Sequence, residues 1–143
     1  MAIVQAVCDS FKLELLQGLH NFTTNTFRLA LYSSAATLGA TTTVYTTAGE
    51  ISGTGYVAGG AVATVAATQL AAVTGGFVAI VDFTDVAWPT ATFTARGALL
   101  YNSTAGNRAV AVLDFGSDKI ATGTTFTVQF PAPTGTDALV RVS

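Results

Sequence analysis

Charged residues are scarce in this chain, and their scarcity limits what it can bind. Six Lys and Arg and eight Asp and Glu give 10% charged residues, against about 25% in a typical soluble domain. Six scattered cations form no basic stripe for a phosphate backbone, so we expect no nucleic-acid partner. Apolar residues make up 50% of the chain, and so little charge covers a monomer poorly. We therefore expect a homo-oligomer or a subunit of a larger assembly.

Cysteine and histidine are nearly absent. Cys8 is the single cysteine and His20 the single histidine. One of each excludes a disulfide framework and a Cys- or His-based metal site within one chain, so we expect no metal and no cofactor. No GxSxG motif accompanies His20, which favours a hydrogen-bonding role over catalysis and predicts that the chain is not an enzyme. A lone thiol such as Cys8 is typical of small apolar packing.

Targeting and membrane signals are also missing. The opening "MAIVQAVCDSFKLELLQGLH" has no cationic start, and Asp9 and Glu14 follow too early for a secretory signal. The uncharged segment from Ala61 to Val81 is rich in Ala and Thr and is interrupted by Gly75 and Gly76. These features predict two strands rather than a membrane helix, and we expect no membrane contact.

Short segments of alternating hydrophobicity fill most of the chain after residue 25. They predict a mainly β fold, an antiparallel β-sandwich or jelly roll of about 7–9 strands. Val and Thr favour strand over the alternative of a helix at Ala61 to Ala72. The expected strands are Thr26–Tyr32, Ala61–Val73 and Phe77–Phe83 as a hairpin, Thr92–Tyr101, Arg108–Phe115, Thr124–Phe130 and Asp137–Ser143.

The connections between these strands carry turn signals. A long excursion rich in Gly and Thr follows Tyr32, with short edge pairings expected at Val44-Tyr45 and Tyr56-Val57. Pro89 is expected to end regular pairing before the strand at Thr92. The segment "GSDKIATG", residues 116–123, is expected to be a connection between two strands.

One helix is expected, near the start of the chain. Asp9 or Ser10 would cap it, and Gly18 would end it. The pattern divides the chain into an N-terminal arm with this short helix, residues 1–20, and a β-sandwich domain, residues 21–143, within a single domain overall. The helix is too short to be stable alone, so it covers the β-core or docks on a partner. Its candidate anchoring residues are Phe11, Leu15 and Leu16.

Arg96 stands out in "TARGALLYN" because it places a cation in an apolar strand. A buried guanidinium needs an acid, and Asp82, Asp85 and Asp114 are the candidates in neighbouring strands. Two pairings stay open: an ion pair inside one subunit, or a pair across an interface between copies. The same aspartates at strand ends favour hydrogen bonds to turn amides over a paired-carboxylate glycosidase site.

The aromatic residues leave room for a carbohydrate-binding or adhesin module. Such a module presents an exposed platform of Trp and Tyr rings. Trp88 is the single tryptophan and is expected to plug the end of a sheet. Tyr32 precedes the glycine-rich excursion, and Tyr45 and Tyr56 lie within it, so the three rings could cluster there.

Four stretches carry a resemblance to a known family: "ALYSSAATL", "GEISGTGY", "TARGALLYN" and "AVLDFG". They resemble small virion structural proteins of tailed bacteriophages, and the likeness runs from Phe11 to about Val142. The resemblance implies a non-enzymatic component of the virion, assembled in the bacterial cytoplasm. A capsid decoration or cement protein fits best, with the chain itself, as a homotrimer, and the major capsid protein as partners. A tail, neck or fibre-base protein is the alternative.

Overall fold

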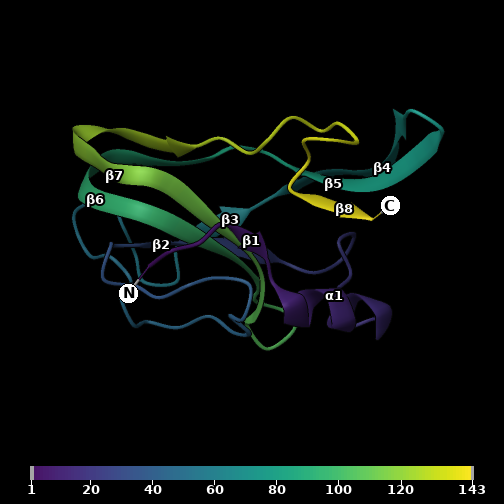
Figure 1. Cartoon of the computed structure of the whole chain (residues 1–143). Coiled ribbons are helices and arrows are strands. Elements are labelled where there is room, and N and C mark those ends of the chain that lie inside the picture. The colour runs from purple at the N-terminus through teal and green to yellow at the C-terminus, as the bar shows by residue number, and fades with distance from the viewer. Residues whose placement is uncertain (1, 143) are drawn as a thin grey trace.

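A long hairpin of two strands, β6 and β7, organises the molecule. The computed structural model describes residues 2–142, so Met1 of the expected arm and Ser143 of the expected last strand lie outside the described residues. β6 spans Val86–Asn102 and β7 spans Arg108–Val128, and the two pair antiparallel along nearly their whole length. Near the turn, they form the centre of a five-stranded sheet with the order β1-β7-β6-β2-β3 (Figure 1).

The remaining strands complete this sheet and form a second, three-stranded one with the order β4-β5-β8. Every ladder is antiparallel. Within residues 2–142, eight strands, two sheets and one short helix confirm the predicted mainly β, sandwich-like class. Their bounds are Ala6–Val7 for β1, Asp9–Leu16 for α1, Phe27–Tyr32 for β2, Ala61–Ala63 for β3, Val65–Val73 for β4, Gly76–Phe83 for β5 and Val140–Val142 for β8.

The expected connection at residues 116–123 is wrong, because β7 continues through it. Between the pairs Ala95–Lys119 and Gly97–Asp114, β6 has one residue and β7 has four, which makes a large bulge in β7. Gly116 takes a φ of +80° there. The ribbon bends at this bulge, and the later part of β7 folds back over the earlier part (Figure 1). Residues 116–120, which suggested a turn, are exposed in the structure.

Two other strand boundaries differ from expectation. The predicted strand Ala61–Val73 is divided at Thr64: β3 pairs with β2 in the large sheet, and β4 pairs with β5 in the small one. The helical alternative for this segment is therefore wrong. Pro89 does not end β6. It interrupts the ladder between Trp88 and Ala91, where Thr90 has a φ of +51°, and pairing then resumes.

The long excursion after β2 is anchored by isolated bridges. Val44 bridges to Arg108, as expected for that segment. Thr54 bridges to Thr92, two residues before the expected Tyr56-Val57 pairing. Two further bridges join Leu38 to Ile3 and Glu50 to Tyr32.

The main core lies between the large sheet and the layers folded over it. Side chains of β2, β6 and β7 fill it, and the base of the small sheet adds Val81, Phe83 and Val140. A second, smaller cluster joins Val78 and Ile80 to Ala138 on the opposite face of the small sheet. The outer part of the β4–β5 hairpin therefore projects beyond the main core.

The N-cap of helix α1 lies one residue before the expected capping residues. Cys8 is its N-cap residue with an extended backbone and no side-chain cap, so Asp9 and Ser10 lie inside the first turn. Gly18, with a φ of +73°, follows the last turn and confirms the expected stop. The N-terminal segment is part of the core, because β1 pairs with β7 and Ile3, Cys8 and Phe11 belong to the main cluster.

Candidate functional site

An apolar groove runs between α1 and the small sheet. It consists of two adjoining hollows of about 390 and 270 Å³, which share Leu15, Val140 and Val142. Figure 1 shows α1 lying below β8 on the side where the small sheet projects. The helix side of the groove adds Val7, Phe11 and Leu16, and the sheet side adds Leu70 and Ala79.

The groove is apolar because of how the three strands alternate. The register places Leu70, Ala79 and Val142 in one row across the sheet, and Ala72 and Phe77 in the next row on the same face. Towards the base of the small sheet, Val81 and Val140 on this face are buried. Towards the tip, it is uncovered, and Leu70 and Phe77 are both 67% exposed.

The polar groups of the groove are few. Lys12 and Arg141 are its only charged lining residues within the described chain. Lys12 pairs with Asp9 at 3.1 Å, and the Arg141 guanidinium donates to the carbonyl oxygen of Thr136. No acid–base pair lines the groove, so its arrangement suits apolar contact rather than bond-making chemistry.

The three predicted helix residues divide between the core and the groove. Phe11 is 2% exposed and packs edge-on against His20 and Phe22. Leu15 is half-buried between the core and the groove. Leu16 is 87% exposed and lines the groove, so it does not share the buried face with Phe11 as the sequence pattern suggested.

Arg96 lies opposite the large bulge of β7. Its Nε is 3.7 Å from Asp114 Oδ1, and its Nη1 is 3.8 Å from Asp118 Oδ1. Asp114 is one of the three expected partners, and Asp118 was missed because residues 116–123 were expected to be a separate connection. Asp82 and Asp85 do not reach Arg96: Asp82 lies in β5 opposite Ala67, and Asp85 accepts a hydrogen bond from the Phe130 amide.

Replacing Arg96 with Met should change the free energy of unfolding by less than about 1 kcal/mol, measured by urea denaturation. Its ion pairs are long and half-exposed, and such pairs contribute little. Arg108→Met is the comparison, because Arg108 Nη1 lies 2.8 Å from the nearly buried Glu14 carboxylate. That variant should lose about 2 kcal/mol. Equal losses in the two variants would contradict this ranking.

His20 is held in a buried polar network. Its Nε2 lies 3.0 Å from Glu14 Oε1, and its Nδ1 lies 3.1 Å from the Asn102 amide nitrogen. A neutral ring that donates through Nε2 and accepts at Nδ1 satisfies both contacts. Among residues 2–142, no hydroxyl is hydrogen-bonded to His20, and the network ties α1 to the β6–β7 turn. His20 thus has the expected hydrogen-bonding role, with two side chains as its partners.

A second network centres on Glu50. Its Oε1 accepts hydrogen bonds from Tyr56 Oη at 2.6 Å and from the Gly59 amide at 2.7 Å, and its Oε2 accepts one from Tyr45 Oη at 2.6 Å. Tyr101 Oη donates to the Gly59 carbonyl at 2.7 Å. This carboxylate thereby orders the long excursion. The sequence offered a signal, since Glu50 is the only charged residue between Arg28 and Asp82.

The tyrosines gather around this network, but their rings and hydroxyls are used internally. Tyr32 is fully buried and donates to the Thr46 carbonyl, and Tyr45 stacks on Tyr101. Trp88 is 4% exposed. Within residues 2–142, every Tyr and Trp is buried or half-buried, which leaves the carbohydrate-binding alternative without the open aromatic platform it needs.

Cys8 is a packing residue in the structure. Its side chain is fully buried, and burial, aided by the nearby Asp9 and Glu14 carboxylates, raises the pKa of the thiol to about 11. A protonated, inaccessible thiol is a poor nucleophile.

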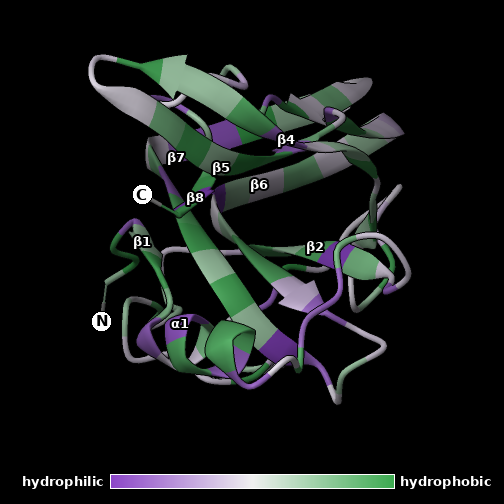
Figure 2. Ribbon diagram, turned by 90° about the vertical axis from the view of Figure 1, so that its right-hand side faces the viewer, coloured by the Kyte–Doolittle hydropathy of each residue, from purple (hydrophilic) through white to green (hydrophobic). Residues whose placement is uncertain are grey.

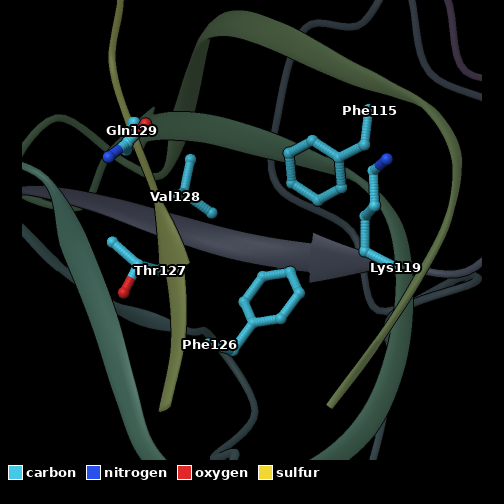
Figure 3. A pocket seen from close by; sticks show the side chains of 6 residues that line it. All are labelled: Phe115, Lys119, Phe126, Thr127, Val128 and Gln129. Atoms are coloured by element: carbon cyan, nitrogen blue, oxygen red, sulfur yellow. The ribbon is translucent and has the colours of Figure 1, made fainter.

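A separate hollow of about 350 Å³ lies inside the bend of β7. Figure 3 shows Phe115 and Phe126 facing it, with Lys119 beside Phe115. Thr127, Val128 and Gln129 complete the lining. Its one charged group is a lysine, so this hollow has no acid–base pair either.

Other kinds of site are not found in the described part of the chain. Residues 2–142 contain no group of three or more His, Cys, Asp or Glu side chains placed to hold a metal ion. None of their helices has the length and hydropathy to cross a membrane. Comparisons with protein-family models, with curated proteins and with solved structures find no match.

Proposed function

We propose that this chain is a non-enzymatic structural subunit of a tailed-phage virion, and that it is a decoration protein bound to the capsid surface. The observation that carries the proposal is the apolar groove with its uncovered sheet face, in a chain that has no exposed catalytic arrangement among its described residues. A large uncovered apolar surface on a small protein is typical of a subunit that binds neighbours.

The resemblance of four sequence stretches to small virion proteins supports the same proposal. Two of those stretches lie in the central hairpin: "TARGALLYN" is the second half of β6, and "AVLDFG" is in β7. "ALYSSAATL" contains the last three residues of β2 and the start of the excursion. "GEISGTGY" contains Glu50 and Tyr56 of the network that orders the excursion. The resemblance therefore concerns residues that build the fold.

A decoration protein must hold its shape while it binds many equivalent positions. The large sheet, the polar networks of His20 and Glu50, and the ordered excursion provide such a scaffold. The partners of the proposed subunit are further copies of itself, expected to form a homotrimer, and the major capsid protein. The proposal needs no metal and no cofactor.

Electron cryomicroscopy of virions with and without this chain tests the proposal. The expected result is density on the outside of the capsid that is lost when the gene is removed. Missing density in the tail, neck or fibre base, with an unchanged capsid, would overturn the capsid assignment in favour of the alternative virion location. Particles unchanged everywhere would overturn the structural role itself.

A further inference from the structure

The β4–β5 hairpin and the apolar groove have properties that suit each other. The hairpin projects with Leu70 and Phe77 uncovered, and Figure 2 shows it mostly in apolar or neutral colours. The groove beside it is lined by Leu16, Leu139 and Val142. We propose that the tip of this hairpin packs into the groove of a second copy of the chain, and that this contact is the main self-association surface. This inference rests on the proposed function, because it describes how the copies of the proposed subunit contact one another.

The area of the uncovered face fits a protein interface. Leu16, Leu70, Phe77 and Val142 are 87%, 67%, 67% and 51% exposed. With the half-buried Leu15 and Leu139 and the exposed alanines between them, they present on the order of 500 Å² of apolar surface. A standard interface buries roughly 800 Å² per partner, of which about 65% is apolar between identical subunits, which is again about 500 Å². The tip and the groove of one copy together therefore offer about the apolar area of one standard interface.

The charge pattern favours this chain as its own partner. From Ala61 to Val81 the sequence contains no charged residue, so the hairpin brings no cation against Lys12 and Arg141 of the groove. It also brings no carboxylate that would lose its hydration there without a partner.

The outer edge of β4 points to the same surface. Within residues 2–142, β4 has a hydrogen-bonded neighbour on the β5 side alone. Its nine residues, "VAATQLAAV", include no charged residue and no proline. Monomeric proteins use charged residues and prolines to protect a free edge, and β4 has neither. Copies that meet at the hairpin would cover this edge.

The test uses two variants that damage opposite sides of the contact. Phe77→Asp places a charge on the tip, and Leu16→Asp places one in the groove; both positions are exposed, so each variant should fold. The matched control is Ile120→Asp, because Ile120 is 74% exposed on β7, away from both surfaces. Circular dichroism checks the fold, and analytical ultracentrifugation measures the mass against the 14.6 kDa single chain.

The expected result is an oligomer for the wild type and for Ile120→Asp, and a monomer for each of the two surface variants. Mixing Phe77→Asp with Leu16→Asp should restore a mixed species, because one retains an intact groove and the other an intact tip. A monomeric wild type at about 100 µM, an oligomer that survives Phe77→Asp, or a mixture that stays monomeric would each overturn the inference.

These outcomes are separable from those of the proposed function. A monomeric protein that is still found on virions would overturn the self-association surface and leave the virion role standing. An oligomer that uses the hairpin and groove but is absent from virions would overturn the virion role and leave the self-association surface standing.

Discussion

Raising the pH from about 9 to about 11 should lower the free energy of unfolding by roughly 4–5 kcal/mol, enough to unfold much of the protein. Burial raises the pKa of all four tyrosines above the ordinary value of 10. The Glu50 carboxylate raises the pKa of Tyr32, Tyr45 and Tyr56 further, whereas Arg28 partly offsets the effect on the pKa of Tyr101.

The sign follows from which state binds the proton more tightly. The folded tyrosines hold their protons above the pH at which the unfolded ones release them, so their contribution to stability is complete below pH 10. It is lost as the pH rises from there towards the raised folded values. Each tyrosine contributes up to about 1.4 kcal/mol per pH unit in that interval.

Tyrosinate absorbance at 295 nm and far-ultraviolet circular dichroism, followed together, check this expectation. Absorbance should stay low while the protein is folded and then rise in the same step in which the circular dichroism changes. The chain in urea should titrate near pH 10 without a step. Gradual ionisation of the folded protein, centred near pH 10, would contradict the internal role of the tyrosine hydroxyls.

Replacing Asn102 with Ala should cost about 3–4 kcal/mol of unfolding free energy. Asn102 is fully buried, and its amide nitrogen lies 3.1 Å from His20 Nδ1 and 2.9 Å from Asn25 Oδ1. Its Oδ1 accepts hydrogen bonds from the Thr104 and Ala105 amides, each at 3.1 Å. Alanine leaves the buried His20 nitrogen without a donor and opens a cavity beside it.

The control is Asn21→Ala, because Asn21 is exposed and its Oδ1 accepts hydrogen bonds within its own turn, from Thr23. That variant should lose less than about 1 kcal/mol. Urea denaturation of both variants provides the comparison. If Asn102→Ala lost no more than Asn21→Ala, the buried network would not be holding α1 to the β6–β7 turn.

Local sequence patterns predicted the parts of the fold that depend on local chemistry. The alternation in "FRLALY" predicted β2, and Gly18 predicted the end of α1 because only a residue that tolerates a positive φ fits there. The bend of β7 could not be predicted in this way. Its polar residues resemble a turn between strands, and only the continued pairing with β6 shows that they form a bulge.

The candidate site was less predictable, because it depends on packing between distant segments. Leu16 was expected with Phe11 and Leu15 on the buried face of α1, but it is five residues from Phe11 and lies on the open side. The groove itself requires α1, β5 and β8 to come together, and no motif marks that. The scarcity of charge predicted an apolar surface, although not where it lies.

The central claim, that this chain is a structural subunit of a virion, is tested most directly by measuring its amount in purified particles. Virions banded on a density gradient and analysed by quantitative mass spectrometry should contain many copies of the chain per particle, in a fixed ratio to the major capsid protein. Its absence from banded virions, with the protein present in the infected cell, would contradict the claim.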